Sequence, residues 1–231
     1  MKNIFKLIGI IAIVAVIGFS FAACGGDDGD DSGGSAALGD NLSLSGQVYT
    51  REIDLKTEDY KFEPYKGLNK TFISNVGGSG SITNGRMSFN VGAPSPGLLE
   101  DFTISDDHDG IGANYTNPKI VPSDVKAIDL DFIDIDLDKS YLSVNLKTSA
   151  TTMEGVTYLY VDRNCTVSAT GKTVTEDNLK VTYQNINLNL KKGWNVVNIR
   201  ITTTKTTGSF SYRTGDLSSC KWVLDDDDDD D

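Results

Sequence analysis

The chain has 231 residues, a formal net charge of −12 and a single histidine. That length is sufficient for one all-β domain with a full hydrophobic core. Nucleic-acid-binding proteins cluster Lys and Arg among aromatic side chains, and no such cluster occurs here, so we expect no nucleic-acid partner.

The first 24 residues have the layout of an export signal. Two lysines precede an uncharged apolar run over residues 7–21, and small residues stand directly before Cys24. The run is short for a membrane-spanning helix, which needs about 20 apolar residues, although an uncleaved anchor is the alternative. The sequence Phe21-Ala22-Ala23-Cys24 resembles the lipobox of bacterial lipoproteins. The resemblance implies that a signal helix over 1–23 is removed and that Cys24 carries the lipid, such as palmitate, that anchors the chain to a membrane.

Residues 24–41 are rich in Gly, Ser and Asp and predict a flexible acidic tether. Five aspartates in it carry −5, the poly-Asp tail 225–231 carries −7 and the signal carries +2, which leaves −2 for 41–224. We therefore expect a nearly neutral single β domain over 42–224 and a disordered tail over 225–231. Acidic residues close behind the Cys also resemble sorting signals of surface lipoproteins; a plain solvated spacer is the alternative.

The body of the chain begins with period-two alternation, which is typical of strands. Leu42, Leu44 and Val48 alternate with polar residues and predict a first strand. Asn84-Gly85 lies between alternating runs, and both residues tolerate positive φ, so we expect a two-residue hairpin turn. Met87, Phe89 and Val91 are then expected to share one face.

Residues 125–138 alternate in two phases. Ile128, Leu130 and Phe132 face one way, and after Phe132 the phase slips by one so that Ile133 and Ile135 continue inward. A β-bulge or a bend that changes strands would absorb such a slip.

The remaining runs are short, regularly spaced and rich in Thr, Val and Tyr, with Gly, Asp and Asn between them. No amphipathic helix separates them. The sequence therefore predicts an all-β fold, either an antiparallel β-sandwich or a meandering β-barrel. The stretch 92–124 holds four of the five prolines and is expected to be irregular.

With Cys24 taken by the lipid, Cys165 and Cys220 remain. An even remainder in an exported protein makes this pair a disulfide candidate. Two separate buried thiols are the alternative.

Catalytic and metal-binding motifs are scarce. A single histidine, His108, disfavours Ser–His and Cys–His schemes and most zinc sites, and we expect no cofactor. Asp106, Asp107 and Asp109 stand before a Gly, as in a calcium loop, but the full EF-hand spacing fails, and a solvated acidic loop is the alternative. The chain contains so many acidic residues that the sequence neither identifies nor excludes the carboxylate pair of a glycan hydrolase.

Aromatic residues on a β-sandwich can stack on sugars. The ligand-binding candidates are Tyr158, Tyr160, Trp194 and Trp222, and Tyr141 and Tyr183 are further candidates. Packing of these rings in the core is the alternative for each.

The signal, the acidic linker, Leu-Lys-Lys-Gly-Trp-Asn at 190–195 and Lys-Trp-Val at 221–223 together resemble treponemal (spirochaetal) lipoproteins. The resemblance implies a cell-envelope protein anchored in the outer membrane, on its periplasmic or its surface side. We expect a non-enzymatic module that binds or displays, with a glycan, a host protein or another envelope protein as partner. A lipocalin-like carrier of a small apolar ligand and a carboxylate-based hydrolase are the alternatives.

Overall fold

The computed structural model describes residues 37–54, 59–67, 69–74, 76–103, 114–130, 133–134, 140–145, 147–149, 151–176, 179–215 and 221–226. Apart from the 3₁₀ turn η1 (Pro96–Leu98) and a 3₁₀ position at Asn114, all regular structure in these residues is strand. The predicted all-β class is therefore confirmed. The expected signal helix over 1–23 and Cys24 lie outside the described residues.

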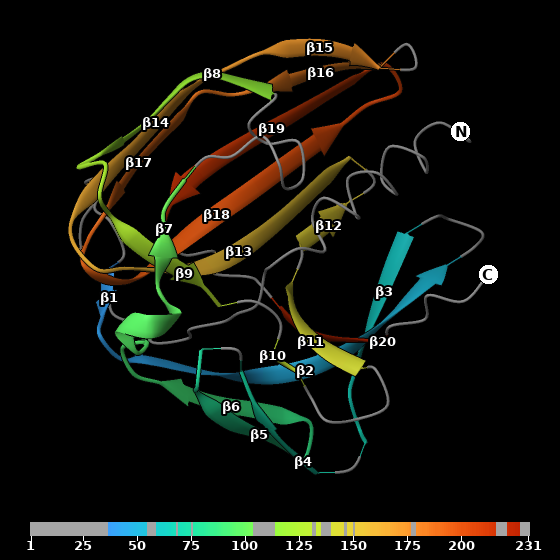
Figure 1. The fold of residues 1–231 in the computed structure, drawn as a ribbon. Coiled ribbons are helices and arrows are strands. Elements are labelled where there is room, and N and C mark those ends of the chain that lie inside the picture. The colour runs from blue at the N-terminus through green and yellow to red at the C-terminus, as the bar shows by residue number, and fades with distance from the viewer. Residues whose placement is uncertain are drawn as a thin grey trace, which may run out of the picture.

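The strands form three sheets (Figure 1). The largest has the order β15 (Thr173–Glu176), β16 (Leu179–Tyr183), β19 (Thr207–Thr214), β18 (Gly193–Thr203), β13 (Thr152–Val161), β9 (Lys126–Asp129) and β7 (Glu100–Asp101), with β1 (Ala37–Gly39) on β18 and β12 (Lys147–Ser149) on β13. The second has the order β10 (Ile133–Asp134), β11 (Ser140–Asn145), β20 (Lys221–Asp226), β2 (Leu42–Asp54), β6 (Arg86–Val91), β5 (Ser79–Thr83) and β4 (Lys70–Ile73), with β3 (Asp59–Pro64) on β2. The third has the order β17 (Ile186–Leu190), β14 (Cys165–Gly171) and β8 (Tyr115–Val121).

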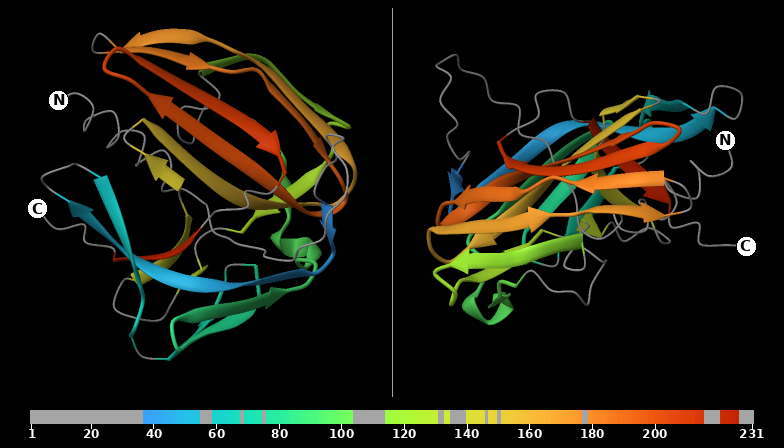
Figure 2. Two further views of the ribbon diagram at one scale, coloured as in Figure 1. Left: turned by 180° about the vertical axis from the view of Figure 1, so that it is seen from behind. Right: turned by 90° about the horizontal axis from the view of Figure 1, so that it is seen from above.

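The sheets pack as a sandwich. Most pairings are antiparallel, and the described exceptions are β2 with β20 and β16 with β19, which are parallel. The nine-stranded and eight-stranded sheets face each other, and neither closes on itself in the two views of Figure 2. Of the two predicted architectures the sandwich is confirmed. The closed barrel, on which the carrier alternative was based, is not the fold.

The main core lies between the two larger sheets. The largest fully buried side chains fill it: Trp194, Trp222, Tyr158, Phe89, Leu42, Leu44, Ile82, Met87 and Leu130. At roughly 1.5–3 kcal/mol for each fully buried large apolar side chain, this layer is the principal stabilising contribution of the fold.

The nine-stranded sheet is covered on its other face too. The three-stranded sheet packs Val167, Leu188 and Leu190 against Val161 and Val197 of β13 and β18. Further along, Val181 and Phe210 pack with Ile199 and Ile201. Strand β18 is consequently buried from Gly193 to Ile199 without alternation.

The first predicted strand and the hairpin are confirmed. Leu42, Leu44 and Val48 are buried in β2 while the serines between them are exposed. Asn84 and Gly85 have φ of 49° and 73° and join β5 to β6 through the pair Thr83–Arg86. The alternation places Met87, Phe89 and Val91 on the buried face of β6, as expected.

The phase slip in 125–138 corresponds to a change of sheet. Strand β9 pairs with β13 in the nine-stranded sheet, whereas β10 pairs with β11 in the eight-stranded sheet. The predicted strand-changing bend is confirmed, with Leu130 fully buried where the chain crosses. Residues 131–132 and 135–139 lie outside the described residues.

Three predicted boundaries need correction. The stretch 92–124 was expected to be irregular, yet it contains β8. Proline is tolerated there because β8 is an edge strand and Pro118 lies at a register shift beside Asn117, whose φ is 53°. At the two ends of the domain, the predicted tether extends to residue 41 but Ala37–Gly39 pairs with β18, and the predicted tail starts at 225 but 225–226 pair with β11.

Candidate functional site

The four aromatic residues predicted to bind a ligand lie together, but inside the main core. Tyr158, Tyr160, Trp194 and Trp222 have exposed fractions of 0%, 5%, 0% and 1%. They do not form an exposed stacking platform, so that prediction is wrong. The physical reason is that alternate positions of β13, β18 and β20 face the opposite sheet, and large rings in this layer fill the space between the sheets.

Two of these rings also form hydrogen bonds to neighbouring segments of the chain. Tyr160 and Trp194 pack edge to face with ring centroids 5.4 Å apart. The Tyr160 hydroxyl donates to Asp40 Oδ1 at 3.1 Å, and Trp194 Nε1 donates to the Gly92 carbonyl at 3.1 Å. Burial, and next the hydrogen bond to Asp40, raise the pKa of Tyr160. Asp40 was assigned to the tether by sequence, whereas here it anchors the end of that segment to the domain.

Cys165 is a free thiol in the structure, buried in the layer between β14 and the central sheet. Burial raises the pKa of this thiol to about 11. Cys165 therefore agrees with the buried-thiol alternative and gives no support to the predicted Cys165–Cys220 disulfide. Cys220 lies outside the described residues.

The predicted calcium ligands Asp106, Asp107 and Asp109, together with His108, also lie outside the described residues. Within the part of the chain that the structure describes, no group of three His, Cys, Asp or Glu side chains is arranged to hold a metal ion. Nothing is described of the side chain of Tyr141, and Tyr183 stacks on Phe210 with centroids 5.0 Å apart.

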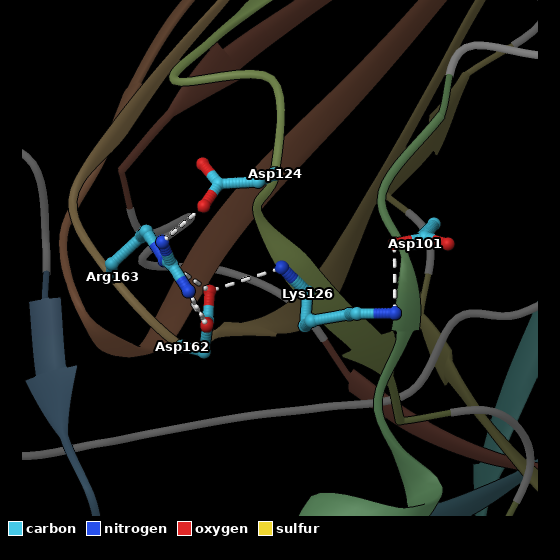
Figure 3. Close-up of polar contacts among 5 residues, drawn as sticks. All are labelled: Asp101, Asp124, Lys126, Asp162 and Arg163. Carbon is cyan, nitrogen blue, oxygen red and sulfur yellow. Dashed lines mark hydrogen bonds and ion pairs between the residues drawn. The ribbon is translucent and has the colours of Figure 1, made fainter.

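A charged cluster joins the turn after β13 to strand β9 (Figure 3). The Arg163 guanidinium contacts Asp162 Oδ2 through Nη2 at 2.8 Å and Asp124 Oδ2 through Nη1 at 2.7 Å. Asp162 Oδ1 accepts the Lys126 backbone N–H at 3.0 Å, and Lys126 Nζ contacts Asp101 Oδ1 at 2.7 Å. The cluster thereby fixes the corner where the chain leaves the nine-stranded sheet for the three-stranded one.

The chemistry of this cluster is that of a structural clamp. The hydrogen bonds from Arg163 lower the pKa of Asp162, so that carboxyl stays ionised at neutral pH. A glycosidase pair needs one carboxylic acid with a raised pKa to protonate the leaving group. Asp162 does not meet that requirement.

An aromatic and cationic cluster lies on the eight-stranded sheet, on the face that points away from the buried Val48 and Trp222. Lys221 Nζ lies 4.8 Å from the ring centroid of Tyr49 and 4.7 Å from that of Phe62. All three side chains are half-buried. The ammonium is held between two rings by cation–π attraction and remains accessible to solvent.

Sequence reasoning missed this cluster, which we call the Lys221 cluster. Its three residues come from β20, β2 and β3, and the parallel pairing of β2 with β20 brings them together. The alternation around Val48 and Trp222 places Tyr49 and Lys221 on outward positions. That signal was in the sequence, but the pairing of the two strands was not.

Comparison of the chain with protein-family models, with curated proteins and with solved structures finds no match. Among the described residues, the structure shows no helix with the length and hydrophobicity of a membrane span.

Proposed function

We propose that this protein is a lipid-anchored protein of the bacterial cell envelope, held in the outer membrane on its periplasmic or surface side. The β-sandwich is its non-enzymatic binding module. The lipid on Cys24 fixes the location, the acidic segment gives reach, and the sandwich presents a rigid surface to a partner.

The observation that carries the proposal is the sequence Phe21-Ala22-Ala23-Cys24 followed by a short acidic spacer that leads directly into an ordered sheet. Residues 25–36 lie between Cys24 and the first described strand, and they span at most roughly 40 Å when extended. Ala37 pairs with Asn195 of the central strand β18. The anchor point is therefore tied through a short spacer to the most buried strand of the domain.

Fatty-acid labelling tests the anchor. The full chain is expressed in a Gram-negative host in the presence of an alkyne-tagged palmitate, and the tag is detected on the protein after a gel. We expect label on the wild type and on Cys165→Ala, and none on Cys24→Ala. Label that persists in Cys24→Ala, or its absence from the wild type, would refute the anchor.

Protease treatment of intact cells then distinguishes the two sides of the membrane. Loss of the sandwich from intact cells places it on the surface. Protection until the outer membrane is permeabilised places it in the periplasm. A protein recovered in the soluble fraction of the cells would contradict both.

A further inference from the structure

The outer face of the eight-stranded sheet combines a fixed cation with polar side chains. We propose that this face binds an acidic polysaccharide, with Lys221 pairing with a carboxylate or sulfate group of the sugar chain. The inference rests on the proposed binding function and names its ligand class.

The Lys221 ammonium is pre-organised for such a contact. Tyr49 and Phe62 hold it at 4.8 Å and 4.7 Å from their ring centroids, so the flexible lysine stem loses less freedom when an anion binds. The partly exposed edges of the two rings also offer apolar surface to the C–H groups of a sugar ring. Cation and apolar surface in one place match a negatively charged sugar.

Small polar side chains extend from the Lys221 cluster across the same face. They alternate with the buried core residues of three adjacent strands and are largely exposed: Ser43, Ser45, Ser79, Ser81, Thr83, Ser88 and Asn90. Ser43 Oγ lies 2.7 Å from Asn90 Oδ1 across strands β2 and β6. Hydroxyl and amide groups in adjacent rows are the donors and acceptors that sugar hydroxyls require.

The charge of the face differs from that of the chain. The described outward side chains of β2, β5 and β6 include no Asp or Glu, and they include the exposed cation Arg86. The chain as a whole has a net charge of −12. Lys221 and Arg86 therefore offer an acidic ligand two cationic contacts on this face of a protein whose net charge is negative, which favours binding in this orientation.

Two other partner classes fit less well. A stable protein interface needs an apolar centre, whereas the described outward residues of β2, β5 and β6 beyond the Lys221 cluster are Ser, Thr, Asn, Gln and Arg. Val223, which pairs with Tyr49 on the same face, is 1% exposed and offers no apolar surface. Nucleic acid is bound by many phosphate contacts from Lys and Arg, whereas Lys221 and Arg86 are the two cations described on β20, β2, β5 and β6 of this face.

The test is binding of the full chain, purified in mild detergent, to immobilised polygalacturonate and heparin, with neutral dextran and single-stranded DNA as comparison probes. We expect binding to at least one acidic polysaccharide, weakening with salt. We expect Lys221→Glu to weaken it about tenfold or more, and Tyr49→Ala, which frees the lysine but keeps its charge, to weaken it by a smaller factor. Arg86→Glu, at a fully exposed position, tests the same face if Lys221→Glu does not fold.

The matched control is Lys205→Glu, which makes the same charge change on the exposed turn between β18 and β19. It is expected to bind like the wild type. Equal losses for Lys205→Glu and Lys221→Glu would overturn the assignment to this face, and equal binding of dextran would overturn the acidic class. Tighter binding of DNA than of any polysaccharide, or no binding to any probe, would also overturn the proposal. The fatty-acid labelling is independent of all four probes, so the anchor can stand where this inference fails.

Discussion

Strands β6 and β18 lie in the two larger sheets, and they differ in how many of their faces are covered. In β6 every second residue is exposed, and the exposed positions are Arg86, Ser88 and Asn90. In β18 the chain from Gly193 to Ile199 is buried on both sides, because the eight-stranded sheet covers one face and the three-stranded sheet covers the other. From Gly193 to Ile199 the side chains of β18 pack in the protein interior, whereas the exposed side chains of β6 are accessible to a ligand.

The comparison explains why the most conspicuous aromatic residues are not the binding residues. Trp194 and Tyr160 are large, and their burial contributes to the core and to the docking of β1. The residues that we propose to face a ligand are instead the Lys221 cluster and the small polar side chains of the eight-stranded sheet. The comparison can be tested by changes in the two regions.

The largest expected effect is on the doubly covered strand. Trp194→Ala is expected to lower the free energy of unfolding by about 3–5 kcal/mol, because it removes a fully buried indole and leaves a cavity. Ser88→Ala on β6 is expected to change it by less than about 0.5 kcal/mol. Urea denaturation of both variants measures the difference, and similar midpoints for the two would show that the two strands contribute equally to stability.

The β5–β6 hairpin of the eight-stranded sheet contains one glycine at which a side chain should not be tolerated. Gly85 has a φ of 73°, and a Cβ there would collide with the Tyr65 carbonyl oxygen. We expect Gly85→Ala to cost about 1–3 kcal/mol of unfolding free energy. Gly97→Ala is the control, since a Cβ at Gly97 meets no atom within 4 Å. Thermal unfolding compares them, and an equally tolerant Gly85 would show that the turn can rearrange.

A side-chain hydrogen bond supports the pairing of β1 with β18. Tyr160→Phe removes the donor to Asp40 and is expected to destabilise the protein by about 1 kcal/mol. Hydrogen exchange of the amides over 37–39 should accelerate in the same variant. The double variant with Asp40→Ala is expected to be no worse than Tyr160→Phe alone, because both remove the same bond. Additive losses would mean that the two residues act separately.

Acid sensitivity is expected at the charged corner. Arg163 lowers the folded-state pKa of Asp162, so the stability contributed by this pair is fully present above the unfolded pKa of about 3.9 and is lost as pH falls through the folded pKa. Asp162→Asn is therefore expected to make the acid side of the stability–pH curve shallower. Arg163→Gln should do the same, since it removes the cause of the shift. An unchanged acid slope in both variants would contradict the clamp.

For the buried thiol of Cys165 we expect no alkylation in the folded protein. Burial raises the pKa of Cys165 to about 11, so we expect iodoacetamide at mildly alkaline pH to leave it unmodified in the folded protein. In concentrated guanidinium the same thiol is expected to react. Peptide mapping by mass spectrometry reports both states. Recovery of a Cys165–Cys220 peptide pair without reduction would contradict the free thiol.

Features that depend on local periodicity could be predicted from the sequence. The alternation at Leu42, Leu44 and Val48 and the Asn84-Gly85 turn were readable because a strand with one covered face repeats every two residues. The phase slip after Phe132 likewise indicated the change of sheet before any partner strand was known. The all-β class followed from the same pattern repeated along the chain.

Which faces are covered and which strands are neighbours became clear from the three-dimensional arrangement of the strands. Trp194 lies in a strand whose two faces are both buried by segments distant in sequence. The residues of that strand do not alternate between buried and exposed, so the sequence pattern does not show which side chains face the main core. The Lys221 cluster needs β20 to pair with β2, which lies at the other end of the domain. The pairing of 37–39 with β18 and the place of Pro118 on an edge strand were hidden for the same reason. Contacts between segments so far apart are selected by the packing of the whole core, which a local pattern does not encode.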